Sequence, residues 1–187
     1  IAVAIVDYEG LGDPDRLHHY MVGEMEGRAV LDGAKALYNI PVAKKIADNR
    51  KLFLGGYSQG GHAVFWADKI AARYARNLKI QGVVGFGPVT NVAKTLVDVT
   101  RGANINWFGP FVAASYNDYY QAGLPITQMI LPKWTSDFMT HVNSRCIDQL
   151  PSYWGKTPEG VYTPEFIQAM RNSLVSSTFA EFSDLLE

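Results

Sequence analysis

The chain has 187 residues, 48% hydrophobic and 19% charged, with a formal net charge of −1, a composition typical of a globular protein with a buried core and not of a disordered tail. Its Lys and Arg residues are scattered singly or in pairs and form no basic run, so no nucleic-acid partner is expected. The longest apolar runs are far shorter than the roughly 20 residues of a membrane-spanning helix, so no membrane span is predicted.

The first ninety residues alternate between short apolar runs and apolar residues at helical spacing. In chain order they predict a strand, a helix, a strand, a helix and a strand, at residues 1–6, 22–38, 51–57, 62–74 and 80–86. Pro41 is expected to end the first helix. Continuous apolar strands joined by helical crossovers indicate an α/β fold whose parallel sheet is covered by helices on both faces.

The composition changes after Pro88, and we predict two domains, residues 1–90 and 91–187. Twelve of the seventeen glycines precede residue 91, whereas fourteen of the 23 aromatic residues follow it. Helices are expected near residues 92–100, 110–120, 134–142 and 164–173. The aromatic side chains of the second domain could line a lipophilic cleft or fill a small helical core, and the two roles are compatible.

One motif carries chemistry: residues 56–60 read GYSQG, the pattern G-x-S-x-G. It lies between a predicted strand and a predicted helix, where a sharp turn lifts a serine hydroxyl above the sheet edge as a nucleophile. We expect Gly56 and Gly60 to be required because a Cβ at either position would clash in such a turn. The amide of Gln59 could then stabilise an oxyanion. The alternative is a plain N-cap serine in a glycine-rich turn.

Four stretches resemble the secretory lipases of the fungal lipase A group and their bacterial relatives, clearly over residues 1–95 and more weakly beyond: VDYEGLG, GRAVLDGAKAL, GYSQGGHAVFWA and YARNLKIQGVVGFGPVTNV. The resemblance implies an α/β-hydrolase core at residues 1–90 and an inserted helical cap at 91–187. It also implies Ser58 as the nucleophile, an oxyanion hole from Asp7 and Gln59, and a secreted or periplasmic location. Taken alone, Asp7 would be read as a solvated turn residue; an α/β-hydrolase needs a second amide from such a loop.

A serine hydrolase also needs an acid and a histidine, in the chain order Ser, Asp or Glu, His. The resembled family carries them beyond the cap. We therefore expect the chain to be a fragment, inactive alone, whose missing strands, acid and histidine belong to the rest of the same polypeptide.

Histidines within the chain are weaker candidates for the base. His62 lies one helical turn after Ser58, but packing in the helix is the favoured role. His18 and His19 follow the Asp7 turn and either rim the pocket or are solvated. His141 has the right chain order, with Asp118 or Asp137 ahead of it, but belongs to the predicted cap.

No metal or cofactor is expected. The pair His18 and His19 and the single Cys146 do not have zinc-ligand spacing, and no H-E-x-x-H is present. Asp13 and Asp15 form a turn rather than a glycosidase pair. The glycine-rich residues 55–61 lack the lysine of a phosphate-binding loop.

The leading hypothesis is a serine carboxylic-ester hydrolase, a lipase or esterase acting on acylglycerols or other esters through an acyl-enzyme. An acyltransferase or peptidase on the same fold is an alternative, because fold does not fix substrate. A non-catalytic lipid-binding remnant of a hydrolase is a second alternative, motivated by the missing base.

Overall fold

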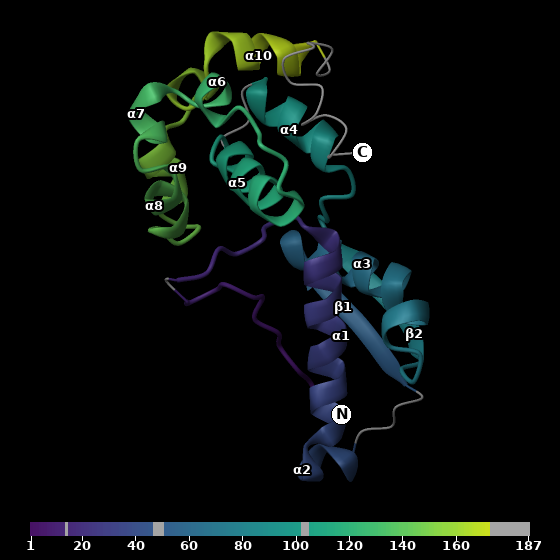
Figure 1. Ribbon diagram of the computed structural model, residues 1–187. Helices are drawn as coiled ribbons and strands as arrows, with labels where there is room; N and C mark the ends of the chain where they lie inside the picture. Colours follow the sequence, from purple (N-terminus) through teal and green to yellow (C-terminus); the bar gives the residue numbers. More distant parts are fainter. Residues whose placement is uncertain (14, 47–50, 102–104, 173–187) are drawn as a thin grey trace. The chain divides into compact units, whose positions relative to one another are not determined.

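The computed structural model describes residues 1–13, 15–46, 51–101 and 105–172, and the chain divides into two compact units, Ile1–Thr90 and Asn91–Glu187 (Figure 1). The division falls where glycine-rich sequence gives way to aromatic-rich sequence. The first unit combines helices with a sheet, and the described part of the second contains helices and one isolated antiparallel bridge, between Ile130 and Tyr162. The interpretation of the units as a hydrolase core and its cap remains a prediction.

The sheet of the first unit consists of two parallel strands, β1 (Leu52–Tyr57) and β2 (Ile80–Phe86). Leu54 pairs with Val83 and Tyr57 with Phe86, and one irregularity in the register lies between Leu52 and Phe53. Both strands were predicted. The bounds of β2 are those predicted, and β1 starts one residue later than predicted, at Leu52. Short apolar runs bounded by turn residues predict such strands from the sequence.

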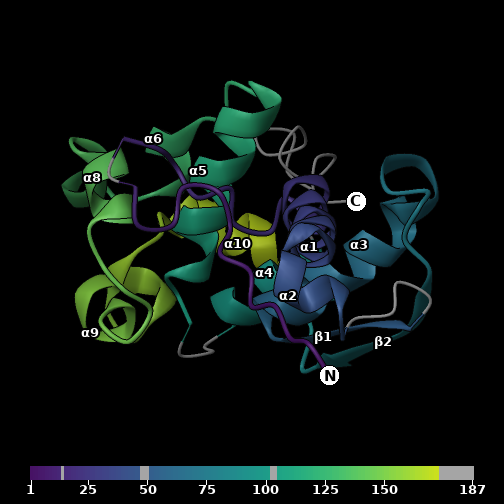
Figure 2. The same ribbon diagram turned by 90° about the horizontal axis from the view of Figure 1, so that it is seen from below.

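Two long helices, α1 (Gly23–Asn39) and α3 (Gln59–Tyr74), pack together on one face of this sheet (Figure 2). Their apolar residues share one core with the inward side chains of β1, among them Leu31, Ala34, Leu52, Leu54, Val64, Ala67 and Ile70. The prediction of helices on both faces was wrong for the described residues, because α1 and α3 cover the same face. The opposite face leaves large apolar side chains exposed: Phe53, Tyr57, Val84 and Phe86.

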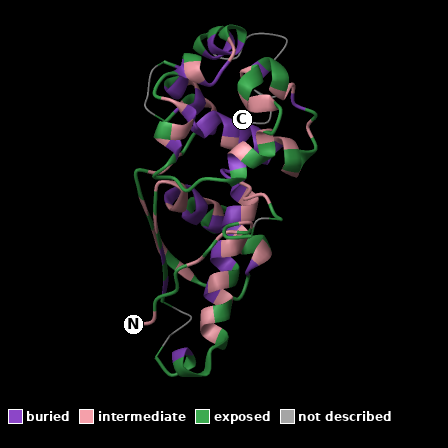
Figure 3. Ribbon diagram, turned by 90° about the vertical axis from the view of Figure 1, so that its left-hand side faces the viewer, coloured by how far each residue is buried: buried purple, intermediate pink, exposed green. Residues whose placement is uncertain are grey.

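The predicted strand at residues 1–6 is absent. Residues 1–13 run as an irregular segment, exposed or partly buried along its length (Figure 3). Ile1, Val3 and Ile5 are exposed at a period of two, whereas the Val6 side chain lies against Gly33 of α1. A strand exists only through hydrogen bonds to a neighbour, and the sheet formed by the described residues contains β1 and β2 alone.

The ends of α1 follow ordinary rules. Glu24 and Glu26 lie in its first turn, where carboxylates interact favourably with the helix dipole. The helix ends at Asn39, because Ile40 precedes a proline and adopts an extended conformation. Pro41 then starts the short helix α2 (Pro41–Lys44).

The second unit is built from short helices: α4 (Val92–Thr100), α5 (Phe108–Tyr120), α6 (Ile126–Met129), α7 (Pro132–Thr135), α8 (Phe138–Asn143), α9 (Leu150–Trp154), a 3-10 turn (Pro158–Gly160) and α10 (Pro164–Arg171). The helix predicted over 134–142 is two helices, because Ser136 and Asp137 interrupt it. The predicted end of the last helix at Ser173 lies outside the described residues. Much of the aromatic content forms a core, including Trp107, Phe108, Trp154, Tyr162 and Phe166.

Within the residues described, no helix is both long enough and apolar enough to cross a membrane.

A first prediction concerns the close crossing of α1 and α3. A Cβ on Gly27 would lie 2.9 Å from the backbone of Ala67 and of Trp66. Gly27→Ala should therefore force the helices apart and lower the free energy of unfolding by about 1–3 kcal/mol. Gly55→Ala is the control, because a Cβ there has no neighbour within 4 Å; its effect should stay within about 0.5 kcal/mol. Urea unfolding followed by circular dichroism measures both, and equal midpoints would contradict the prediction.

Candidate active site

Ser58 occupies the turn between β1 and α3 with φ 52° and ψ −114°, a conformation that non-glycine residues rarely adopt. Its N–H still donates to the carbonyl of Phe86 in β2 at 2.9 Å, and α3 begins at the next residue. Ser58 precedes the helix as its N-cap, yet its side chain makes no capping hydrogen bond. The N-cap alternative therefore does not explain why a serine stands here.

The tight turn depends on Gly56. A Cβ at this position would lie 2.0 Å from the carbonyl oxygen of Gly60. The matching expectation for Gly60 was wrong: its nearest neighbour would be the Tyr8 hydroxyl at 3.8 Å, which is ordinary contact. The second position without room is Gly61, where a Cβ would lie 2.8 Å from the Pro88 side chain.

The turn that carries Asp7 lies beside the first turn of α3. The Leu11 N–H donates to the Tyr8 carbonyl at 3.1 Å, and Gly10 has φ 83°. The Tyr8 side chain reaches from this turn to within van der Waals range of a Cβ on Gly60. The structure thus brings together the two segments that contain Asp7 and Gln59, and the Asp7 side chain is exposed.

Behind the Ser58 turn lies a buried carboxylate that the sequence analysis missed. Glu26 of α1 is 1% exposed. Its Oε1 accepts hydrogen bonds from the Met21 N–H at 2.9 Å and from Gln59 Nε2 at 2.7 Å, and its Oε2 accepts one from His62 Nδ1 at 2.6 Å. A signal was available: Glu26 lies four residues from both Val22 and Val30, on the buried face of the helix.

His18 extends this cluster toward the Asp7 turn. Its Nδ1 lies 3.1 Å from the Glu9 carbonyl oxygen and its Nε2 lies 2.6 Å from Gln59 Nε2. Because the carbonyl can only accept and the amide nitrogen only donates, Nδ1 carries the proton and Nε2 accepts. Burial lowers the pKa of His18, which favours this neutral form.

Two tyrosines enclose the same cluster. Tyr8 stacks on His18 with ring centroids 5.6 Å apart, and Tyr20 lies edge-on at 6.1 Å. Burial, together with repulsion by the Glu26 carboxylate, raises the pKa of Tyr8 to about 12 and also raises the pKa of Tyr20. Both phenols are therefore neutral at physiological pH.

The candidate bases have other partners. His62 is 6% exposed and donates to Glu26, as expected for a packing residue. His141 Nδ1 shares a hydrogen bond with the Tyr153 hydroxyl, and its ring packs against Trp134 and Trp154 within the second unit.

Asp137 immediately precedes α8, and its backbone carbonyl accepts the N–H of His141 at 3.0 Å.

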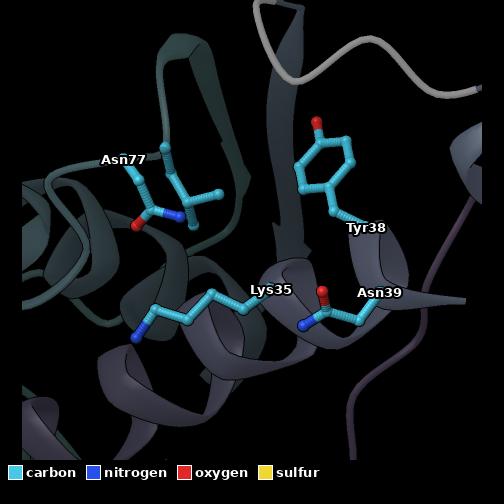
Figure 4. A pocket seen from close by; sticks show the side chains of 5 residues that line it. Lys35, Tyr38, Asn39 and Asn77 are labelled. Carbon is cyan, nitrogen blue, oxygen red and sulfur yellow. The ribbon is translucent and has the colours of Figure 1, made fainter.

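Two hollows lie away from Ser58. One is lined by Lys35, Tyr38, Asn39, Asn77 and Leu78 (Figure 4). The other is lined mainly by the end of α3 and the start of β2. Both adjoin the amino end of β2, whereas ligands of parallel α/β sheets bind at the carboxyl ends, where Ser58 lies. Among the residues that the structure describes, no group of three or more His, Cys, Asp or Glu residues could hold a metal.

A strained serine at the carboxyl end of a parallel strand, followed at once by a helix, is typical of the α/β-hydrolase fold. Two crystal structures share the fold: the rice cell wall degrading esterase LipA from Xanthomonas oryzae (TM-score 0.73, 16% identity, 91% of this chain and 48% of that one) and Candida antarctica lipase A (TM-score 0.64, 23% identity, 87% and 36%). The predicted fold class, a partial α/β-hydrolase, is confirmed.

The family is also established. A family model described as secretory lipase matches residues 1–178, and the chain belongs to this family. A secreted triacylglycerol lipase of Malassezia furfur is 33% identical over 152 residues, which cover 79% of this chain and 28% of that protein. The chain thus spans less than a third of that relative's length. The family assignment supports the predicted secreted location.

The glycines of the turn give a second prediction. Gly56→Ala should destabilise the protein by about 1–3 kcal/mol or more, because its Cβ would meet backbone atoms that cannot move aside. Gly60→Ala should be neutral or slightly stabilising, since alanine is favoured over glycine in a helix. Thermal unfolding of the two variants measures the difference; a Gly60→Ala variant as unstable as Gly56→Ala would contradict it.

A third prediction follows from the lowered pKa of His18. In the unfolded chain this residue titrates near 6.5, and in the folded protein below that value. Between the two pKa values the unfolded chain binds more protons, so the stability contribution is full above 6.5 and declines as the pH falls toward the folded pKa.

His18→Gln should flatten this decline, because glutamine keeps an acceptor and cannot titrate. The groups that face His18 are Glu9 through its carbonyl, Gln59, Glu26, His19 and the rings of Tyr8 and Tyr20. The measurement is urea unfolding of both proteins from about pH 5 to about pH 8. Parallel curves for the wild type and the variant would count against the prediction.

Proposed function

We propose that the whole protein is a carboxylic-ester hydrolase, a lipase or esterase, in which Ser58 is the nucleophile. The observation that carries the proposal is the strained conformation of Ser58 at the end of β1, with a hydroxyl that makes no capping bond. Membership of the secretory lipase family supports the same activity. Lipid or other ester substrates follow from this assignment.

In the proposed mechanism the Ser58 hydroxyl attacks the ester carbonyl and gives its proton to a histidine. The negative charge develops on the former carbonyl oxygen, and the amides of Gln59 and Asp7 are proposed to donate to it. The N-terminal end of α3, a helix of 16 residues, adds favourable electrostatics. Release of the alcohol leaves an acyl-enzyme, which water then hydrolyses.

The general base is proposed to come from elsewhere in the polypeptide. The imidazoles of His18, His62 and His141 have partners other than Ser58. The chain also spans 28% of the matched Malassezia lipase, so the whole protein has room for an acid and a histidine.

The second unit is proposed to be the cap over the acyl-binding site. Its buried aromatic core supports a self-contained helical domain. We also propose that this unit presents a lipophilic surface to the acyl chain of the substrate. Acyl transfer to an alcohol, peptide hydrolysis and lipid binding without catalysis remain rival functions of the same fold, and product analysis with an added alcohol separates the first from ester hydrolysis.

The direct test is Ser58→Ala in the full-length protein. With a p-nitrophenyl ester as substrate, kcat/KM should fall on the order of 10⁴-fold or more, because the acyl-enzyme can no longer form. Labelling by a fluorophosphonate probe should be lost as well. Ser144→Ala, an exposed serine of the second unit, is the matched control and should keep both. Equal rates for the Ser58 variant and the wild type would rule out the nucleophile; absence of labelling in the wild type would favour a non-catalytic protein.

A further inference from the structure

Glu26 of α1 accepts hydrogen bonds from two other parts of the first unit, the segment before α1 and the first turn of α3. Met21 precedes α1, Gln59 opens α3, and His62 lies one turn further along that helix. All three donate hydrogen bonds to the one carboxylate, at 2.6 to 2.9 Å. A carboxylate buried to this degree is stable only with such donors, since burying an unpaired charge is costly. The segment before α1, α1 itself and the first turn of α3 are therefore fixed relative to one another by a single side chain.

The Gln59 side chain is held in one orientation by these contacts. Its amide nitrogen lies 2.7 Å from Glu26 Oε1 and 2.6 Å from His18 Nε2. Both neighbours accept, so both protons of the amide group are used, and a flipped amide would set its oxygen against a carboxylate. Gln59 directly follows Ser58, so fixing its side chain also restrains the peptide between the two residues.

The same hydrogen bonds continue to the other proposed oxyanion segment. His18 accepts from Gln59 through Nε2 and donates to the Glu9 carbonyl through Nδ1. Glu9 lies two residues after Asp7, in the same turn. The Tyr8 ring, stacked on His18, makes a second contact between this turn and the cluster. An unbroken path thus runs from Glu26 through Gln59 and His18 to the Asp7 turn.

We propose that Glu26 is a positioning residue of the oxyanion hole: its carboxylate fixes Gln59 and, through His18, holds the Asp7 turn and the Ser58 turn in one arrangement. The catalytic part of this statement rests on the proposed function. Glu26 itself touches no reacting atom. It acts by keeping two backbone amides at a fixed spacing, on which stabilisation of a developing oxyanion depends.

Met21 indicates that the arrangement is locally strained. It is fully buried with φ 62°, an unusual conformation for a residue with a side chain. The hydrogen bond from its N–H to Glu26 stabilises that conformation. Loss of the carboxylate should therefore release the segment before α1 as well as Gln59.

The first test is kinetic and uses the full-length protein. Glu26→Ala and Gln59→Met should each lower kcat about 10- to 100-fold with little change in KM, because both release the Ser58–Gln59 peptide and leave the substrate site in place. Gln59→Met keeps the length of the side chain and the backbone amide. The double variant should be no worse than either single variant, because both remove the same link. Glu26→Gln should recover much of the activity, since it keeps an acceptor for Met21 and Gln59.

The second test does not depend on hydrolysis. Hydrogen exchange followed by mass spectrometry reports the amides of residues 7–12 and 58–62 in the wild type and in the variants. Both segments should exchange faster together in Glu26→Ala and in Gln59→Met. Gln59→Met serves if Glu26→Ala does not fold. Gly60→Ala is the control in the same turn and should leave both segments as in the wild type.

The outcomes separate the two proposals. Faster exchange confined to residues 58–62 would overturn the link to the Asp7 turn, whatever the activity. Additive losses of kcat in the double variant would overturn the role through Gln59. A third outcome is a wild type that neither hydrolyses esters nor labels at Ser58, while residues 7–12 and 58–62 exchange faster together in the variants. That outcome would overturn the proposed function and leave the link between the two turns standing.

Discussion

The geometry around Ser58 depends on the near-contact of Gly56 with the first turn of α3. The backbones of Gly56 and Gly60 lie so close that a Cβ on Gly56 would not fit. Because Gly56 has no side chain, the chain can leave β1 and enter α3 within one residue. Ser58 adopts its unusual φ as the consequence. The parallel pairing of β1 with β2 and the packing of α3 on α1 hold that turn from both sides. Strain at this single residue is thus stabilised by the surrounding core.

A second constraint on the Ser58 turn is the buried carboxylate of Glu26. The Glu26 side chain is 1% exposed, and an unpaired charge at such a buried position would be strongly unfavourable. Its three donors lie up to 36 residues from Glu26 along the chain. Hydrophobic packing gives the first unit its stability, whereas this polar cluster selects one arrangement of the loops. Fully hydrogen-bonded polar networks of this kind rigidify a protein core and specify one arrangement of it.

Sequence patterns predicted the local features well. The apolar runs of β1 and β2, the helical spacing of α1 and the serine between glycines all report on neighbours in the chain, and the structure agrees with them. Three features depend on residues far apart and were missed or misjudged. The apolar residues 1–6 read as a strand but have no partner in the described sheet. The steric need assigned to Gly60 falls on Gly61, because Pro88 packs there. Glu26 was overlooked, since its role exists only once α1 and α3 are in contact.

Among the residues that the structure describes, no helix covers the second face of the sheet, and this matters for work with lipids. Phe53, Tyr57, Val84 and Phe86 are 51% to 78% exposed and lie on adjacent strands. An apolar surface of this kind adsorbs to oil–water boundaries, to detergent and to other copies of the chain. Association of these residues with an emulsion is therefore a poor measure of substrate recognition. Water-soluble short-chain esters avoid the ambiguity, because they report on the hydrolysis proposed for Ser58 without offering an interface to which the sheet can adhere.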